Sequence, residues 1–248
     1  MTIATRFAAA LHEQTARGPG GTELLPVRLT RAAAATLGVD AAGLSVVDAA
    51  GARIPLGSSS TDAACAERLQ FTVGAGPCWE AQRTRQPVFA VQADLRRRWA
   101  PFADLLASQT PFRAVVAFPL REDLAGAGAL DLYFTADAAV PALDVFAAVA
   151  VGELVTAALT EAAVWSDWPA ERGPDWLHGP EARRRAAVLR AAGRAAMALE
   201  TDPATALTLL RGTAWSGGRT VEDVAEDLET GVLRIEDLAA GPVQGPAA

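Results

Sequence analysis

The chain of 248 residues contains no lysine and no asparagine, so all 22 of its cationic side chains are arginines. Only two cysteines, Cys65 and Cys78, are present, which excludes a disulfide-rich scaffold and is typical of a reducing compartment. Histidine is equally scarce, and His12 and His178 supply little material for a zinc site or a Ser-His-Asp triad. We therefore expect no metal site, no catalytic residues and a role other than that of an enzyme.

Positive charge is also in deficit, with 29 acidic against 22 basic residues and a net charge of −7. This balance disfavours a protein that coats nucleic acid through its overall field, although it leaves room for a local basic patch. No targeting segment is evident. The most apolar stretch, 142–159, is interrupted by Asp144 and Glu153, which indicates a buried or dimer-forming helix rather than a membrane span. We expect a cytoplasmic protein with no membrane partner.

What is present is a chain that is 51% hydrophobic and rich in alanine, enough to form a packed core. Between residues 22 and 163, short apolar segments alternate with helical patterns. Residues 44–48 and 52–58 predict a hairpin, and residues 113–120 and 128–134 are the two clearest strands. The pattern predicts an α+β fold in which helices pack on a mainly antiparallel sheet.

A long helix is predicted from 141 to 163, and it carries an apolar stripe at steps of three and four residues. This stripe would pack on the sheet or pair with a second copy across a two-fold axis. Its members are Leu143, Phe146, Val149, Ala150, Leu154 and Ala157.

The last third of the chain predicts an all-α three-helix bundle. Asp202 before Pro203 is typical of a helix start, and Thr220 with Asp223 forms a capping box. Prolines, glycines and tryptophans between 164 and 180 indicate a linker whose tryptophans dock on a domain. The predicted organisation is a loose arm (1–21), an α+β domain (22–163), this linker (164–180), the bundle (181–231) and a flexible tail (232–248).

Charge divides the bundle into two parts. From Arg183 to Arg219 there are seven arginines against Glu200 and Asp202, whereas residues 220–238 carry seven acidic side chains against one arginine. The bundle therefore has a basic front and an acidic back, which the net charge of the chain conceals.

Two known families resemble these two regions. Residues 22–163 resemble a GAF domain, the small-molecule sensor fold, in Gly76-Pro77-Cys78, in 99–102 and in the two final strands. Residues 183–230 resemble an ANTAR domain, the three-helix RNA-binding module of transcription antiterminators. The matching positions there are Ala192, Met197, Ala206, Leu210, Arg211, Ala214, Arg219, Val224 and Ala225. A GAF domain followed by an ANTAR domain is the arrangement of actinobacterial antitermination regulators.

The GAF resemblance implies a pocket over one face of the sheet for a small molecule, and the sequence assigns no cofactor. The wall residues would be Phe71, Cys78, Trp79, Trp99, Phe102, Phe118 and Tyr133, unless these side chains simply form the core. Cys78 follows a proline at a helix start, where the helix dipole would lower the thiol pKa. It is therefore either a redox-reactive group or a buried structural thiol.

The ANTAR resemblance implies that the bundle binds tandem stem-loops in nascent RNA. Arginines would contact phosphates, and Trp215 would either stack on a base or anchor the bundle core. The predicted RNA-binding residues are Arg183, Arg184, Arg190, Arg194, Arg211, Trp215 and Arg219.

We therefore predict a homodimeric, ligand- or redox-responsive RNA-binding regulator of transcription antitermination. A first alternative is a thiol-dependent enzyme on the GAF fold, similar to methionine sulfoxide reductase. A second is a protein-interaction module whose bundle has lost RNA binding, because Gly193 precedes Arg194 where the ANTAR pattern has a basic residue before glycine.

Overall fold

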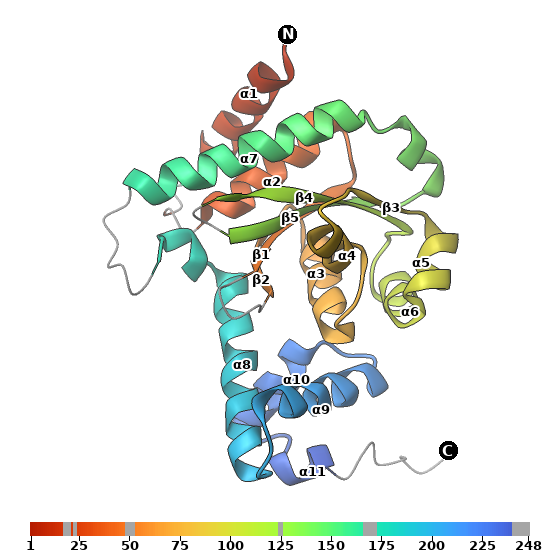
Figure 1. Cartoon of the computed structure of the whole chain (residues 1–248), viewed down its shortest axis with the longest axis vertical. Helices are drawn as coiled ribbons and strands as arrows, with labels where there is room; N and C mark the ends of the chain where they lie inside the picture. The colour runs from red at the N-terminus through yellow and green to blue at the C-terminus, as the bar shows by residue number, and fades with distance from the viewer. Residues whose placement is uncertain (17–20, 22–23, 48–52, 124–125, 166–172, 240–248) are drawn as a thin grey trace.

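The computed structural model describes residues 1–16, 21, 24–47, 53–123, 126–165 and 173–239 (Figure 1). The elements of the first domain are α1 (Ile3–Ala16), α2 (Leu25–Leu37), β1 (Ala41–Val47), β2 (Arg53–Ser58), α3 (Thr61–Val73), α4 (Pro77–Thr84), β3 (Val88–Ala90), α5 (Gln92–Arg98), α6 (Ala100–Gln109), β4 (Ala114–Asp123), β5 (Gly126–Phe134) and α7 (Val145–Trp165). The bundle contains α8 (Pro180–Ala198), α9 (Pro203–Ser216), α10 (Val221–Thr230) and α11 (Ile235–Ala239). Short 3-10 helices at Asp137–Ala142 and Asp175–His178 precede α7 and α8.

Five strands form one sheet in the order β2-β1-β5-β4-β3, and every neighbouring pair is antiparallel. This confirms the predicted α+β class and the hairpin predicted at β1 and β2, and the two clearest predicted strands pair with each other as β4 and β5. The register pairs Phe118 with Leu130 and Ala117 with Asp131, and this pairing decides which side chains of β4 and β5 share a face.

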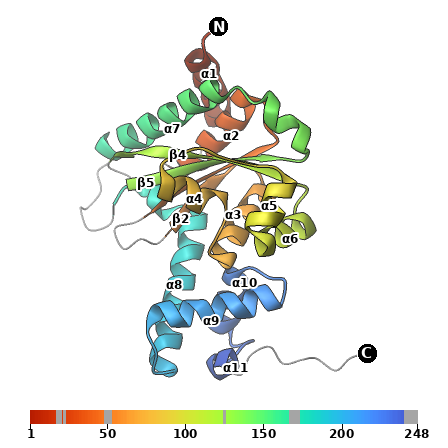
Figure 2. The same ribbon diagram turned by 45° about the vertical axis from the view of Figure 1, so that its right-hand side comes forward.

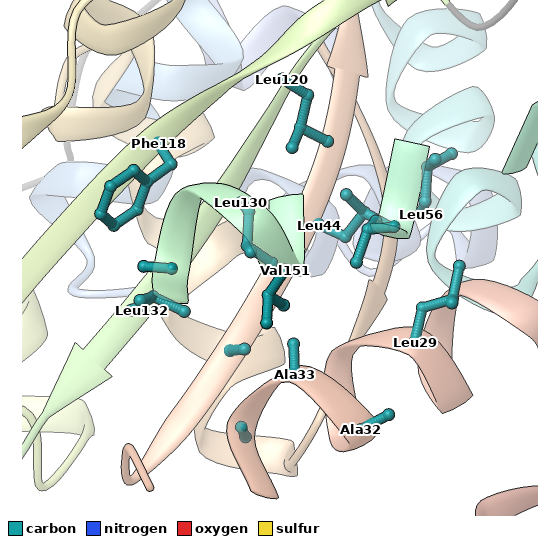
Figure 3. Packing of buried hydrophobic residues seen from close by; sticks show 14 of the residues in the cluster. Leu29, Ala32, Ala33, Leu44, Leu56, Phe118, Leu120, Leu130, Leu132 and Val151 are labelled. Carbon is teal, nitrogen blue, oxygen red and sulfur yellow. The ribbon is translucent and has the colours of Figure 1, made fainter. Parts of the chain in front are cut away.

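Different helices cover the two faces of the sheet (Figure 1). One face carries α1, α2 and α7, and alternate side chains of the strands point into this apolar layer. The other face carries α3, α4, α5 and α6, with the bundle beyond them (Figure 2). Figure 3 shows the first layer, in which residues of α2, the strands and α7 meet: Leu29, Ala33, Leu44, Leu130 and Val151.

Local capping follows the sequence closely. The Asp202 side chain accepts hydrogen bonds from the backbone N–H groups of Ala204 and Thr205, and the capping box of Thr220 and Asp223 is complete. Gly38 ends α2 in the left-handed conformation that glycine adopts without strain. These helix ends were predictable because they depend on residues within one turn of each other.

The N-terminal segment is helical where we predicted a loose arm. In α1, Phe7 is buried in the core of the sheet layer, and Ile3, Ala10 and Leu11 pack beside it. The spacing of these apolar residues gives α1 a face that α2 and α7 cover. The predicted tail also begins with structure, because α11 buries Leu238 in the bundle core; residues 240–248 lie outside the described part of the chain.

Helix α7 begins at Val145, after Asp144 accepts a hydrogen bond from the N–H of Ala147 at 3.0 Å. Its sheet-facing residues are Ala148, Val151, Val155 and Leu159. By contrast, Phe146 of the predicted stripe points outward and is 89% exposed. Residues 145–164 are long and apolar enough to cross a membrane by length and composition alone, a test that the core helix of a sheet layer also passes.

The linker is partly described. Trp176 is almost completely buried in the core that α2 and α7 share, which confirms that this tryptophan docks the linker on the domain. The side chain of Trp165 and the whole of Trp168 lie outside the described residues.

Candidate functional site

A buried ion-pair network lies under the sheet, between β2, β5 and α3. The Nη2 atom of Arg53 donates to Glu67 Oε2 at 2.7 Å and to Asp131 Oδ2 at 3.2 Å. None of these three side chains is exposed by more than 1%. Charged groups so fully removed from water require partners, and the two carboxylates share the guanidinium of Arg53.

Two uncharged side chains complete the network. The Tyr133 hydroxyl donates to Glu67 Oε1 at 2.7 Å, and the Gln70 amide donates to Asp131 Oδ2 at 3.0 Å and to the Tyr133 oxygen at 3.2 Å. The amide oxygen of Gln70 accepts the backbone N–H of Cys78 at 3.2 Å, which ties the start of α4 to the network.

Gly43 makes room for this arrangement. A Cβ atom there would lie 2.2 Å from Glu67 Oε1, so β1 can approach the carboxylate only because the position is glycine.

Burial and neighbouring charges shift the pKa values of the charged groups in this network. Burial, followed by the nearby Glu67 carboxylate, raises the pKa of Asp131 well above its ordinary value and favours its protonated form. Burial opposes the charge on Arg53, but the surrounding Cys78, Glu67 and Asp131 outweigh it and raise the pKa of this guanidinium. Arg53 Nε, Arg53 Nη1 and Asp131 Oδ1 have no hydrogen-bond partner among the described residues, so the network can accept further polar contacts.

The predicted pocket residues separate into three groups. Trp99, Phe102 and Tyr133 pack together under the sheet, and Cys78 lies beside the network. Phe71 and Trp79 pack instead against the bundle. Phe118 lies on the opposite face of the sheet, among the residues under α2 and α7, so it does not line a pocket with Tyr133. The seven side chains therefore do not surround one cavity.

The two thiols do not have the character expected of reactive cysteines. Burial raises the pKa of Cys78 well above its ordinary value, although the nearby Arg53 acts in the opposite direction. This corrects our expectation that the start of α4 would lower it, because desolvation outweighs the dipole at a fully buried sulfur. Burial also raises the pKa of Cys65. Both thiols are free, and Cys78 fits the structural alternative.

Arg185 of α8 joins the network to the bundle, and our list of site residues did not include it. Its Nη1 donates to the backbone carbonyl of Arg53 at 2.6 Å, and its Nη2 donates to Glu222 Oε1 at 2.8 Å. Its guanidinium carbon lies 3.1 Å from the ring centroid of Phe71. Burial lowers the pKa of Arg185 to about 10, while Glu222 opposes the shift. A sequence signal existed, because Arg185 occupies the same helix face as the buried Ala182, Val188 and Ala192.

Further polar contacts hold α3 and α6 against the bundle. The Thr72 hydroxyl accepts the N–H of Val221 at 2.9 Å, and the Gln109 side chain donates to the carbonyl of Gly218 at 2.8 Å. Arg211 stacks on the same Phe71 ring as Arg185, with its guanidinium carbon 4.4 Å from the centroid. The first domain and the bundle therefore share a specific interface (Figure 2).

Most of the predicted RNA-binding arginines have protein partners. Arg190 pairs with Glu229 at 3.5 Å and Arg219 with Asp227 at 2.6 Å, so the acidic α10 offsets part of the basic front. Arg184 pairs with Glu181, and Arg183 donates to the carbonyl of His178. Arg211 is half-buried at the interface. Arg194 is exposed, and Trp215 is 51% exposed, so Trp215 is not an anchor of the bundle core.

Comparison with known proteins places the first domain in a family. The profile of the GAF domain matches residues 27–160. No match was found among the curated proteins.

Three similar solved structures are all bacterial domains. A domain of a putative two-component sensor histidine kinase from Sinorhizobium meliloti 1021 is 18% identical, with 57% of this chain and 92% of that chain covered and a TM-score of 0.42. The GAF domain of an Acinetobacter phosphoenolpyruvate-protein phosphotransferase is 10% identical, with 67% and 97% covered and a TM-score of 0.42. The nlh2 GAF domain of A. aeolicus in an inactive state is 12% identical, with 62% and 95% covered and a TM-score of 0.42. Because the family profile spans more than half of the chain, this protein belongs to the GAF domain family, a family of sensory and regulatory modules.

Proposed function

We propose that this protein is a ligand-responsive regulator whose C-terminal bundle binds RNA and prevents transcription termination. The observation that carries the proposal is the hydrogen bond from Arg185 to the carbonyl of Arg53. Through it, the buried network of the GAF domain directly contacts the bundle.

The input is a small molecule bound under the sheet. The unpartnered atoms of Arg53 and Asp131 supply donors and an acceptor there, and Tyr133 and Phe102 supply apolar wall. Polar groups set in an apolar environment are the usual composition of a ligand site. A ligand is favoured over a redox signal because the pKa of each thiol is raised.

The signal reaches the bundle through Arg185. A ligand that engages the Arg53 guanidinium shifts the strand residue whose carbonyl Arg185 binds. Since the same Arg185 holds Glu222 of α10, the positions of α8 and α10 follow. The ligand acts by favouring one of two pre-existing arrangements, and it needs differential affinity for the two.

The output is RNA binding by the exposed face of the bundle. Arg194 and the partly exposed Arg190 and Arg219 provide phosphate contacts, and Trp215 provides a stacking surface beside Arg219 in the chain. Arginine and tryptophan side chains together suit unpaired bases of an RNA loop. The target class is a tandem stem-loop in a nascent transcript.

The protein acts as a homodimer through the outer face of α7. Phe146 and Val149 are exposed there, and Val149 lines an apolar cavity of about 200 Å³ together with Phe118, Leu120 and Gly152. An exposed apolar side chain beside an apolar hollow is self-complementary across a two-fold axis. A dimer interface on the outer face of α7 would cover the apolar side chains that a membrane would otherwise contact, so the proposal includes a cytoplasmic location.

Filter binding with a tandem stem-loop RNA at two salt concentrations tests the proposal. We expect affinity to fall with salt, Arg194→Ala to lower the salt slope by about one, and Trp215→Ala to cost about 1–3 kcal/mol of binding free energy. Arg96→Ala, an exposed charge change on α5, is the matched control. Salt-independent binding, or binding that neither bundle variant alters, would reject the RNA proposal.

One observation favours a protein-interaction module instead. Arg190 and Arg219 each pair with an acidic residue of α10, which reduces the charge available for phosphate. In that case the same filter-binding experiment yields no RNA complex, while ligand-dependent changes in the bundle persist in hydrogen exchange. No comparable observation supports the thiol-dependent enzyme, since Cys78 is buried and its pKa is raised.

A further inference from the structure

A second cavity lies outside the core of the GAF domain and is lined by residues of α3, α8 and α10. It encloses about 380 Å³, which is within the range of sites for small metabolites. Its charged lining comes from two arginines and four carboxylates: Arg68, Arg184, Glu222, Asp223, Glu226 and Glu229.

The two signs of charge occupy different walls. The carboxylates all belong to α10, where Glu222, Glu226 and Glu229 share one face at helical spacing. The arginines come from α3 and α8, and both contact Glu181, Arg68 at 3.4 Å and Arg184 at 3.7 Å. These are long ion pairs, so N–H groups of both guanidinium groups remain available to a ligand.

Glu222 provides an independent indication of a ligand. Its side chain is only 8% exposed, and Arg185 occupies its Oε1 atom at 2.8 Å. Its Oε2 atom has no hydrogen-bond partner among the described residues. An unpaired carboxylate oxygen at this depth is destabilising, and because Glu222 lines the cavity, a small rotation of its side chain would bring this oxygen to a cationic N–H donor there.

We propose that this cavity binds a free amino acid with a cationic side chain. Its carboxylate would contact Arg68 and Arg184, and its two cationic groups would contact Glu222 and Glu226 on the opposite wall. The excess of acidic over basic lining residues selects a ligand with more positive than negative charge. This site is distinct from the ligand site proposed at the buried network of Arg53 and Asp131, and the inference does not depend on RNA binding.

Occupancy of this cavity would hold the GAF domain against the bundle. A ligand that contacts α3 on one side and α8 and α10 on the other binds only the docked arrangement. By mass action it therefore stabilises the interface that Arg185 makes. The cavity is a second input to the same interface.

Isothermal titration calorimetry of the full chain with L-lysine, supported by thermal unfolding, tests the assignment. We expect saturable binding at one site and a rise in Tm with ligand. Glu226→Gln and Arg184→Gln should each weaken binding about tenfold or more, since each removes a charge-assisted contact at an exposed position where folding tolerates the change. Glu161→Gln and Arg96→Gln, exposed changes of the same charge elsewhere, should leave binding unchanged.

Cadaverine, which has the two amines of lysine but no carboxylate, tests whether the carboxylate of the ligand contributes to binding. We expect it to bind at least tenfold more weakly than L-lysine and to be insensitive to Arg184→Gln. The assignment is overturned if L-lysine shows no saturable binding, if Glu226→Gln leaves its affinity unchanged, or if cadaverine binds as tightly. RNA binding measured on the same variants reports separately on the proposed function.

Discussion

Arg185 donates a hydrogen bond of 2.6 Å to the backbone carbonyl of Arg53, although 132 positions separate the two residues in the chain. Arg53 is the cation of the buried network of the GAF domain, and Arg185 is a buried cation of the bundle. Arg185 uses its remaining N–H groups on Glu222 and places its guanidinium on Phe71. Arg185 therefore links Arg53 of the GAF domain to α8 and, through Glu222, to α10.

Removing the Arg185 side chain should destabilise the full chain strongly. Arg185→Met leaves Glu222 buried without its cation, and we expect a loss of about 3–5 kcal/mol in the free energy of unfolding by urea. The double variant Arg185→Met with Glu222→Leu should recover much of this loss, because no uncompensated charge remains. A loss in the double variant equal to the sum of the losses in Arg185→Met and Glu222→Leu alone would show that the pair is not coupled.

The protonation of Asp131 should make stability depend on pH. Because the pKa of Asp131 is raised, the folded chain keeps a proton that the unfolded chain releases above a pKa of about 3.9. Its contribution to stability is therefore complete below that pH and is lost as the pH rises through the folded pKa. Asp131→Asn should flatten the pH dependence of urea unfolding above pH 4, whereas the exposed Asp104→Asn should not; parallel profiles for all three proteins would contradict this.

Two glycine substitutions should act in opposite directions. Gly43→Ala places a Cβ 2.2 Å from Glu67 Oε1, and we expect this overpacking to cost about 1–3 kcal/mol. Gly193→Ala, in α8 with no atom within 4 Å of the new Cβ, should stabilise the bundle by about 0.5–1 kcal/mol. Thermal unfolding of both variants measures the two effects. If Gly43→Ala leaves the Tm unchanged, β1 shifts enough to accommodate the added methyl group and the expected overpacking is wrong.

The two cysteines should differ in their reaction with iodoacetamide. Cys65 is half-buried and Cys78 is fully buried, and burial raises the pKa of both. We expect Cys65 to alkylate slowly at pH 8 and Cys78 to alkylate only in denaturant, as followed by mass spectrometry. Rapid labelling of Cys78 in the native protein would revive the thiol-dependent alternative.

Substitution of Phe146 should change the mass of the protein in solution. Phe146 is 89% exposed on the outer face of α7, so Phe146→Glu should leave the fold intact and convert a dimer to a monomer in light scattering. Val232→Glu, at another exposed apolar residue, is the control and should remain dimeric. If the native chain is itself a monomer, the proposed dimer is wrong.

Local interactions determined the features that we predicted correctly. The caps at Asp202 and Thr220, the end of α2 at Gly38 and the strands β4 and β5 all arise from residues within a few positions of each other. Periodicity and capping act over one or two helical turns, so a single sequence is sufficient to reveal them. The α+β class followed from the order of these segments.

Long-range packing decided the features that we missed. The register of β4 against β5 places Phe118 on the face opposite Tyr133, and no local pattern records that register. The apolar face of α1 becomes buried only when α2 and α7 pack against it. For the same reason our prediction did not separate the buried Arg185 from the exposed Arg183 and Arg184 beside it.

The sequence by itself thus determined the elements, their class and the division of charge within the bundle. Only the tertiary structure decided that Arg185 leaves this basic front to bind Arg53 and Glu222, and that acidic side chains of α10 pair with Arg190 and Arg219. The physical reason is that the role of a charged side chain depends on the groups with which it pairs. Those partners come from segments that only folding brings together.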